Sequence, residues 1–298
     1  MMLREAGATV VKIEAPGEGD YGRSMAPLID GTGAIFRFTN AGKQSVVLDL
    51  KSESGKAALL RMAAGADVLV EGFRPGVMDR LGLGPREMAA VNPRLIFASL
   101  TGHADGSTEA GHDLNYLAAA GLLGWPPRIP AAPIADIAGG SLQLVNKILL
   151  ALLDRARTGA GARLVVSMVE GLAPVALAPR AFAAAGAPNP LSGVYPCYNL
   201  YDTADGEYLA VAALEPKFWR EFCTAVEQPD WISHQFDQEF VWIAADTIAG
   251  RDLEWWLSRT QGRDCCVNRV RPPSPLPLPE DPPPALGEHN AQWRAPGS

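Results

Sequence analysis

Two side chains in the middle of the chain have the types and surroundings that proton transfer needs. His112 stands in Gly-His-Asp-Leu-Asn-Tyr at 111–116, and Asp136 stands in Pro-Ile-Ala-Asp-Ile-Ala-Gly-Gly-Ser at 133–141. Each is an isolated polar residue among small and apolar neighbours. An imidazole, with a reference pKa of roughly 6.5, and a carboxyl group that face each other form an acid–base pair. The structural alternatives are a buried His bonded to a backbone carbonyl and an Asp that caps a helix.

The segments around this pair alternate between predicted strands and predicted helices. Runs of branched apolar residues predict strands at 9–14, 45–49, 67–71, 95–100 and 162–167, and helical patterns cover 52–64, 77–81, 85–91, 113–123, 140–158 and 168–177. This alternation predicts an α/β fold with a mostly parallel, doubly wound sheet. Ligands bind beyond the carboxyl ends of the strands in such sheets. The turns that follow these strands are therefore the expected ligand edge.

The remaining segments predict a hairpin with helices, a linker, an irregular Pro-rich segment and a shortened N-terminal part. A hairpin is expected over 195–212 around an Asp-Gly turn, with helices at 215–226 and 251–259. The Ala- and Pro-rich segment 178–190 reads as a linker, and Pro is too frequent over 271–285 for a regular element. Residues 1–7 look like the end of a helix whose beginning and preceding strand are missing, so we expect the N-terminal part of the fold to be shortened.

Composition excludes several classes of protein. A formal net charge of −7 argues against a nucleic-acid partner. The four cysteines have no Cys-x-x-Cys spacing, and only four His are available, so no metal site is expected. Their arrangement is not a disulfide framework, which indicates a reducing compartment. No apolar run reaches the roughly 18 residues that span a bilayer, and no signal peptide is recognisable. We expect a cytoplasmic protein without a membrane partner.

A set of segments in a fixed order carries a family resemblance over most of residues 7–225. The segments are Gly-Ala-Thr-Val-Val-Lys-Ile-Glu at 7–14, Lys-Gln-Ser-Val-Val-Leu-Asp-Leu-Lys at 43–51, Asp-Val-Leu-Val-Glu-Gly-Phe-Arg-Pro-Gly-Val at 67–77, Arg-Leu-Gly-Leu-Gly at 80–84, Asn-Pro-Arg-Leu-Ile at 92–96, the two segments around His112 and Asp136, Val-Ser-Met at 166–168 and Ala-Leu-Glu-Pro-Lys-Phe at 213–218. With these segments the chain resembles the family III CoA-transferase superfamily (CaiB/BaiF-like), and within it the α-methylacyl-CoA racemases.

The resemblance implies a fold and an assembly. A Rossmann-like large domain that binds CoA would span 1–180 and be joined by about 270–298. A linker at 181–193 and a smaller α+β domain at 194–269 would complete the chain, and two copies would form an interlocked homodimer. Relative to the family, the C-terminal third is also shortened.

The resemblance further implies an acyl-CoA substrate and roles for three residues. Asp136 matches the superfamily's catalytic aspartate, which is the nucleophile in transferases and an acid–base residue in racemases. His112 matches a histidine of the racemase branch. Glu215 matches a glutamate that orients that histidine, although its place before Pro216 also fits a helix start.

Four further residues match the family's CoA site. Arg23 matches an arginine placed on a CoA phosphate, and Glu71, Gly72 and Arg74 match the turn that lines the adenine and phosphate region. Arg74 also fits an ordinary surface position. No cofactor is implied beyond the CoA moiety of the substrate.

The sequence therefore predicts an isomerase that racemises or epimerises 2-methylacyl-CoA thioesters. One group removes the α-proton and another returns it through an enolate. The first alternative is a CoA-transferase with Asp136 as the acyl-accepting nucleophile; no Gly-rich loop follows Glu215, which counts against it. The second alternative is a degenerate acyl-CoA-binding homologue without activity. The identity of the acyl chain does not follow from the sequence.

Overall fold

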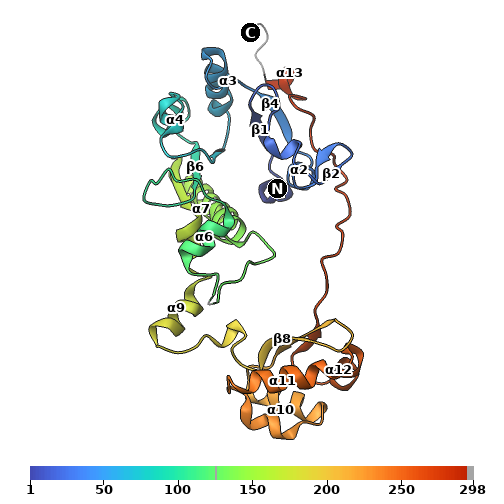
Figure 1. Cartoon of the computed structure of the whole chain (residues 1–298). Helices are drawn as coiled ribbons and strands as arrows, with labels where there is room; N and C mark the ends of the chain where they lie inside the picture. Colours follow the sequence, from blue (N-terminus) through green and yellow to red (C-terminus); the bar gives the residue numbers. More distant parts are fainter. Residues whose placement is uncertain (125, 294–298) are drawn as a thin grey trace. The chain divides into compact units, whose positions relative to one another are not determined.

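A computed structural model describes residues 1–124 and 126–293. Residue 125 and residues 294–298, the end of the segment predicted to join the large domain, lie outside the described residues. The chain divides into two compact units, one formed by 1–175 with 276–298 and the other by 176–275 (Figure 1). The domain boundaries given by the sequence stay predictions.

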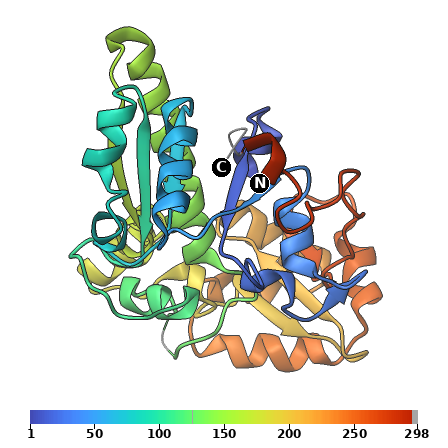
Figure 2. The ribbon, with the colours of Figure 1, turned by 90° about the horizontal axis from the view of Figure 1, so that it is seen from above.

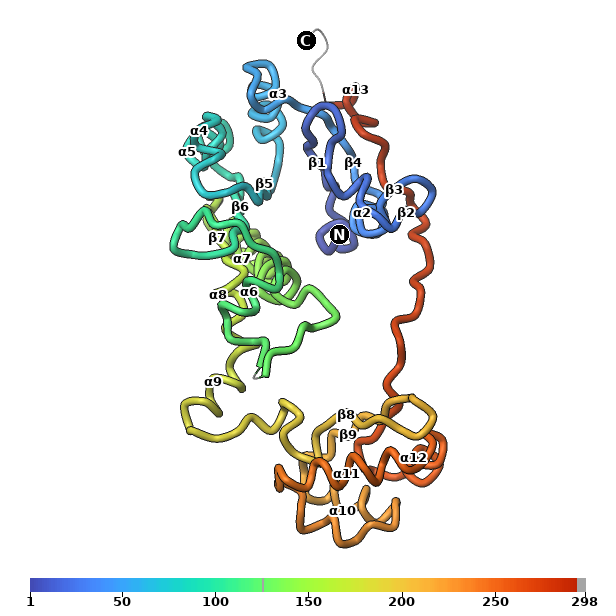
Figure 3. The backbone as a smooth tube through the Cα atoms, viewed as in Figure 1, coloured from blue at the N-terminus to red at the C-terminus, as the bar shows by residue number. Residues whose placement is uncertain are grey.

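The first unit contains the predicted parallel strands, but in two sheets. Strands β1 (Val11–Glu14) and β4 (Gln44–Val47) form one parallel pair. Strands β5 (Val68–Glu71), β6 (Ile96–Thr101) and β7 (Ala162–Ser167) form a second parallel sheet in the order β5-β6-β7 (Figures 2 and 3). The described strands do not join these two sheets, so the predicted parallel strands are divided between them.

The other elements of this unit follow the predicted alternation, with additions in the N-terminal loop. They are α1 (Met2–Glu5), η1 (Tyr21–Arg23), β2 (Leu28–Ile29), β3 (Thr32–Gly33), α2 (Ala34–Asn40), α3 (Glu53–Ala64), α4 (Val77–Arg80), α5 (Pro85–Val91), α6 (Asp113–Ala120), η2 (Ala135–Ser141), α7 (Leu142–Thr158), α8 (Met168–Gly171) and α13 (Asn290–Trp293). Ser52 caps α3 as the sequence predicts, because its hydroxyl accepts a hydrogen bond from the Gly55 N–H at 3.0 Å.

Helices cover both faces of the β5-β6-β7 sheet. Leu144 and Ile148 of α7 pack with Ala98 of β6 and with β7 on one face. Phe97, which points to the opposite face of β6, belongs to the cluster that contains residues of α3 and α5. Neighbouring residues of one strand thus bury their side chains on opposite sides, as in a doubly wound sheet.

Helices η2 and α7 form one continuous helix, Ala135–Thr158, of 24 residues. By length and composition it could cross a membrane, which differs from the expectation that no apolar stretch is long enough. The helix is longer than predicted because it begins at Ala135 rather than at Gly140. Since Leu144 and Ile148 are buried against the sheet, its contacts are those of a helix that covers a sheet.

The second unit combines an antiparallel sheet with helices. Its elements are α9 (Leu177–Ala184), η3 (Pro190–Ser192), β8 (Tyr198–Asp202), β9 (Tyr208–Ala212), α10 (Pro216–Ala225), η4 (Pro229–His234), α11 (Phe240–Ala249), α12 (Leu253–Thr260) and β10 (Val267–Arg269). The sheet order is β10-β9-β8, and the predicted hairpin is β8–β9. Trp219, Phe222 and Trp256 are buried in its core. Helix α9 occupies part of the predicted linker, since Ala favours helix.

A buried ionic group stabilises the N-terminal part of the first unit. The Glu14 side chain is fully buried, and Arg23 donates to both of its oxygens, from Nε at 2.8 Å and from Nη2 at 2.7 Å. The Ser45 hydroxyl and the Asp20 N–H donate to the same carboxylate at 2.6 and 3.0 Å. Burial acts to raise the pKa of Glu14, but these hydrogen bonds outweigh it and hold the pKa below its ordinary value.

Replacing Arg23 by Met tests this arrangement. A buried carboxylate left without its cation should lower the free energy of unfolding by about 3 kcal/mol at pH 7. Because the pKa of Glu14 is lowered in the folded state, the stabilisation is present above its ordinary pKa and is lost as the pH falls through the lowered one. Urea denaturation of the unmodified protein and of Arg23→Met at several pH values measures the loss in the free energy of unfolding. This loss should become smaller in acid.

The matched control is Lys56→Ala, which removes the ion pair between Lys56 and the exposed Glu53. It should change the stability by less than about 0.5 kcal/mol. An equal effect of the two substitutions would contradict the role assigned to the buried carboxylate.

Candidate active site

Two cavities open beside the carboxyl ends of β5 and β6, where a doubly wound sheet binds its ligands. The larger has a volume of about 370 Å³, and its walls include Gly72, Gly111 and His112. The smaller has a volume of about 240 Å³ and is lined by residues that include Glu71 and Arg163. Both cavities share four wall residues, namely Phe73, Arg74, Pro75 and Thr101.

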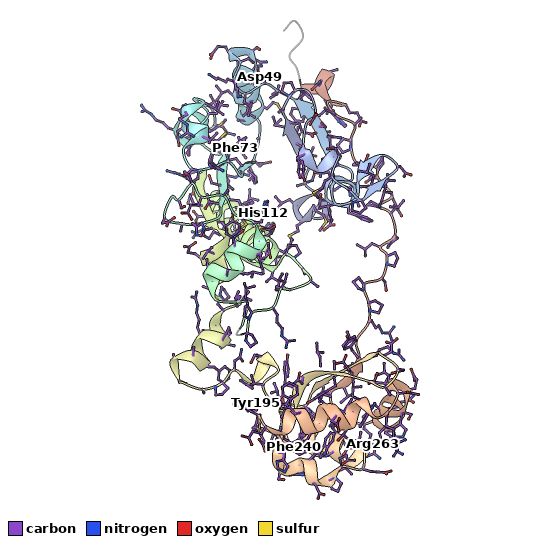
Figure 4. All side chains as sticks on the ribbon, in the orientation of Figure 1. Asp49, Phe73, His112, Tyr195, Phe240 and Arg263 are labelled. Atoms are coloured by element: carbon purple, nitrogen blue, oxygen red, sulfur yellow. The ribbon has the colours of Figure 1, made fainter. Side chains whose placement is uncertain are left out.

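His112 immediately precedes helix α6 and is held by that helix (Figure 4). Its N–H donates to Oδ1 of Asn115 at 3.0 Å, and its carbonyl accepts from the Asn115 N–H at 2.9 Å. The residue is exposed and lines the larger cavity. The apolar setting inferred from its sequence neighbours therefore does not bury it, and its alternative role as a buried core histidine is wrong.

Asp136 is the second residue of η2, a π-helix, and not a helix cap. The Ser141 hydroxyl donates to the Asp136 carbonyl at 2.9 Å across the wider turn. Such π turns are frequent at functional sites. Gly139 allows the close packing of this segment, since a Cβ there would lie 2.2 Å from the Met168 carbonyl oxygen.

A hydrogen bond between the two predicted catalytic segments brings them together. The Asp136 N–H donates to Oδ1 of Asp113, at 2.9 Å. Asp113 is the residue after His112, so this bond ties the start of α6 to the first turn of η2. His112 is then close enough for its charge to act on Asp136.

The surroundings of Asp136 change the pKa of its carboxyl group. Burial and the negative charge of Asp113 raise the pKa of the Asp136 carboxyl, and the charge of His112 offsets part of this effect. A carboxyl group with a raised pKa exchanges protons nearer to neutral pH than an ordinary aspartate does. Perturbed groups of this kind are frequent in active sites.

The predicted CoA-binding turn follows β5 at the shared wall of the cavities. Glu71 accepts a hydrogen bond from the Phe73 N–H at 2.8 Å, which shapes the turn. Gly72 lines the larger cavity, Glu71 the smaller one and Arg74 both. The Arg74 side chain forms no ion pair among residues 1–124 and 126–293, so its charge is available to a ligand.

Arg23 and Glu215 are not among the wall residues of either cavity. Arg23 binds the Glu14 carboxylate and donates from Nη1 to the Pro284 carbonyl at 2.9 Å, and it lines neither cavity. Glu215 belongs to the second unit, where it is exposed and precedes α10, with Pro216 in the first turn. A phosphate contact for Arg23 and support of His112 by Glu215 stay predictions.

Sequence reasoning missed Asp113 and Tyr116. Asp113 immediately follows His112, and neighbouring residues at a helix start do not point the same way. That same geometry lets Asp113 reach Asp136 while His112 faces the cavity. Tyr116 lines the larger cavity, and its hydroxyl donates to the Gly111 carbonyl at 2.9 Å. Its signal was its place about one helical turn after His112.

Comparisons with known proteins identify a family and agree with the fold. A family model described as CoA-transferase family III matches residues 1–290. α-Methylacyl-CoA racemase from Homo sapiens is 37% identical over 297 residues, which cover 91% of this chain and 72% of the human protein. Acetyl-CoA:oxalate CoA-transferase from Acetobacter aceti is 41% identical over 180 residues, which cover 57% of this chain and 46% of that protein.

Among solved structures, the crystal structure of Rv3272 from M. tuberculosis matches with a TM-score of 0.79 at 29% identity. The match covers 98% of this chain and 92% of that one. These comparisons confirm the family resemblance and the mixed α/β fold with parallel strands. The interlocked homodimer and the cytoplasmic location stay predictions.

Replacing Asp113 by Asn tests the electrostatic link between the two segments. The variant keeps an oxygen that can accept the Asp136 N–H but removes the neighbouring negative charge, so the pKa of Asp136 should fall toward its ordinary value. A carbon NMR titration of the carboxyl groups measures this, with Asp136→Asn to assign the signal.

Asp113→Ala serves as the comparison, because it also removes the hydrogen bond. It should lower the free energy of unfolding by about 1 kcal/mol. An unchanged or higher pKa for Asp136 in the Asn variant would show that Asp113 does not act on it through charge.

Proposed function

Because the chain belongs to CoA-transferase family III, a group that includes racemases and CoA-transferases, we propose that it racemises or epimerises 2-methylacyl-CoA thioesters. The observation that carries the proposal is the hydrogen bond from the Asp136 N–H to Asp113. It joins two segments that are distant in sequence, and the charge of His112 acts on the Asp136 carboxyl, whose pKa is raised.

The reaction needs two proton carriers and no other reactant. One group takes the proton from the carbon beside the thioester carbonyl, and the electron pair of the broken C–H bond enters the enolate. The other group gives a proton to the opposite face of that carbon, and the new C–H bond restores the thioester with inverted configuration. His112 and Asp136 fill these two roles, and each regains its starting state when the reverse reaction occurs.

The presence of His112 supports proton exchange over the transferase alternative. A racemase needs a second proton carrier besides Asp136. Burial and the charge of Asp113 raise the pKa of Asp136, which brings its proton exchange closer to neutral pH. His112 adds a second titratable group on the cavity wall, which the transferase mechanism does not require.

Arg74 is the proposed anchor for the CoA phosphates. It stands on the wall between the two cavities, so a phosphate bound there would let the acyl end reach the larger cavity beside His112. Arginine binds phosphate through paired charge-assisted hydrogen bonds. Glu71 and Gly72 shape the same turn, and Glu215 is the proposed partner of His112.

Incorporation of deuterium at the α-carbon tests the proposed reaction. In D₂O the protein should label a 2-methylacyl-CoA, and His112→Ala and Asp136→Ala should each slow labelling by roughly 100-fold or more, since each removes one proton carrier. Mass spectrometry of the thioester measures the label. His234→Ala is the matched control, because its ring pairs with Asp237 in the second unit and should leave the rate unchanged.

Three other outcomes separate the alternatives. Absence of labelling by the unmodified protein would sink the racemase proposal. Hydroxylamine inactivation that requires acyl-CoA and leaves a hydroxamate at Asp136 would support the transferase. CoA binding with neither reaction would support the degenerate homologue.

Replacing Arg74 by Ala tests the phosphate anchor. Loss of a charge-assisted contact should raise the KM for acyl-CoA roughly tenfold and leave kcat nearly unchanged, because the lost interaction is made equally in the ground and transition states. The acyl-pantetheine analogue, which lacks the nucleotide, should show no change. Steady-state kinetics of labelling measure both substrates.

Arg86→Ala is the control, since Arg86 is exposed on α5 and lines neither cavity. A similar KM increase for both variants, or for both substrates, would be evidence against a phosphate contact at Arg74.

A further inference from the structure

We propose that Tyr116 is a positioning residue that holds both ends of the loop 102–112 and thereby fixes the backbone of His112. The proposal deepens the proposed function and rests on it where it concerns catalysis. Tyr116 itself does not exchange protons with the substrate; it acts through His112.

The loop that Tyr116 holds is the only connection between β6 and α6 and contains no helix or strand (Figure 3). Its first half contributes His103 and Gly106 to the smaller cavity, and its second half contributes Ser107 and Glu109 to the larger one. An eleven-residue segment without regular hydrogen bonding needs anchors if the walls of both cavities are to keep their shape.

One anchor is a single peptide group held from both sides. The Tyr116 hydroxyl donates to the Gly111 carbonyl at 2.9 Å. The N–H of the same peptide bond belongs to His112 and donates to Oδ1 of Asn115 at 3.0 Å. Two neighbouring side chains of α6 therefore fix the plane of the peptide that leads into His112, and with it the direction in which the imidazole leaves the backbone.

The other anchor is the aromatic ring, which packs between the two ends of the loop. A Cβ on Gly102 would lie 2.6 Å from Cε1 of Tyr116, and one on Gly111 would lie 3.0 Å from the same atom. Glycine at both positions lets the backbone approach the ring this closely. The His103 ring meets Tyr116 edge-on, with centroids 5.6 Å apart and planes at 74°.

The Gly102 end is in turn fixed to the sheet and α8. The Gly102 carbonyl accepts hydrogen bonds from the Ser167 hydroxyl at 3.0 Å and from the Val169 N–H at 3.1 Å. The ring of Tyr116 thus links a rigid strand end to the peptide before His112. Since Tyr116 is buried, with 6% of its surface exposed, this link is shielded from water.

The chain offers a closely matched control in Tyr201. Its hydroxyl also donates to a backbone carbonyl five residues earlier, that of Pro196, at 2.9 Å, and its surface is 3% exposed. Tyr201 belongs to the second unit and lines neither cavity. Tyr→Phe at either position removes one buried hydroxyl hydrogen bond and keeps the ring, so the two variants should lose similar stability.

The experiment compares Tyr116→Phe with Tyr201→Phe by hydrogen–deuterium exchange and by α-proton labelling of a 2-methylacyl-CoA. Tyr116→Phe should speed amide exchange in peptides that cover 102–112 and lower kcat roughly tenfold with KM within twofold, because the imidazole is misdirected while the binding surfaces remain. Tyr201→Phe should leave both measurements unchanged.

Two results would overturn the proposal. The first is unchanged amide exchange of 102–112 in Tyr116→Phe, and the second is a loosened loop with unchanged kcat. If Tyr116→Phe does not fold, Gly102→Ala tests the proposal in its place. Its Cβ must displace the Tyr116 ring, and amide exchange in the peptides that cover 102–112 should then be faster.

The amide-exchange readout needs no turnover, so the two proposals fail separately. If the unmodified protein does not label the thioester, the proposed function is wrong. Faster exchange confined to 102–112 then still supports the positioning of His112 by Tyr116, and unchanged exchange rejects it.

Discussion

The direct backbone contact between η2 and α8 is the constraint on which the placement of Asp136 depends. A Cβ on Gly139 would lie 2.2 Å from the Met168 carbonyl oxygen, and a Cβ on Gly171 would lie 1.9 Å from the Gly139 carbonyl oxygen. No side chain fits at either point, so the two segments meet through their main chains. This contact fixes how closely η2 packs against α8, and thereby where Asp136 lies.

An apolar cluster joins α6, η2 and α8, and hydrogen bonds to backbone groups complete the site. Asp113 holds the Asp136 N–H, and Asn115 holds the N–H of His112. The same short helix, α6, therefore positions both candidate proton carriers. The arrangement keeps two carboxyl groups close together, which disfavours ionisation of Asp136 and is tolerated because the surrounding hydrogen bonds determine the geometry. The glutamate–arginine pair at Glu14 shows the opposite arrangement, a buried charge that is fully compensated.

Local patterns predicted the regular elements well where the signals were strong. Strand β7 and helix α5 have the predicted bounds, 162–167 and 85–91, since a branched apolar run marks the first and Pro85 at the first helical turn marks the second. Helix α2 was missed, because its aromatic and branched residues are more typical of a strand. The division into two sheets depends on pairing between distant strands, which no local pattern reports.

The candidate site was predictable in its residue types and not in its connections. The sequence pointed to His112, Asp136 and the turn at Glu71–Arg74, but the bond from the Asp136 N–H to Asp113 joins residues far apart in the chain, and composition gives no signal for it or for the π turn. Arg23 was assigned to a phosphate by its position in the family, and its contact with Glu14, at the end of a preceding strand, has no signal in the local sequence. Roles that depend on tertiary contacts are therefore the ones that sequence patterns leave open.

The π turn also separates the packing of α7 on the sheet from the direction of the Asp136 side chain. In an uninterrupted helix, the first would fix the second. Removing one residue from a π turn restores α-helical spacing and rotates everything before it by about 100° around the helix axis. The buried face of α7 could then stay against the sheet while Asp136 turned away from Asp113. A single-residue deletion within Ala135–Ser141 is thus a short evolutionary route between a chain that presents a carboxyl group at this site and one with the same fold that does not.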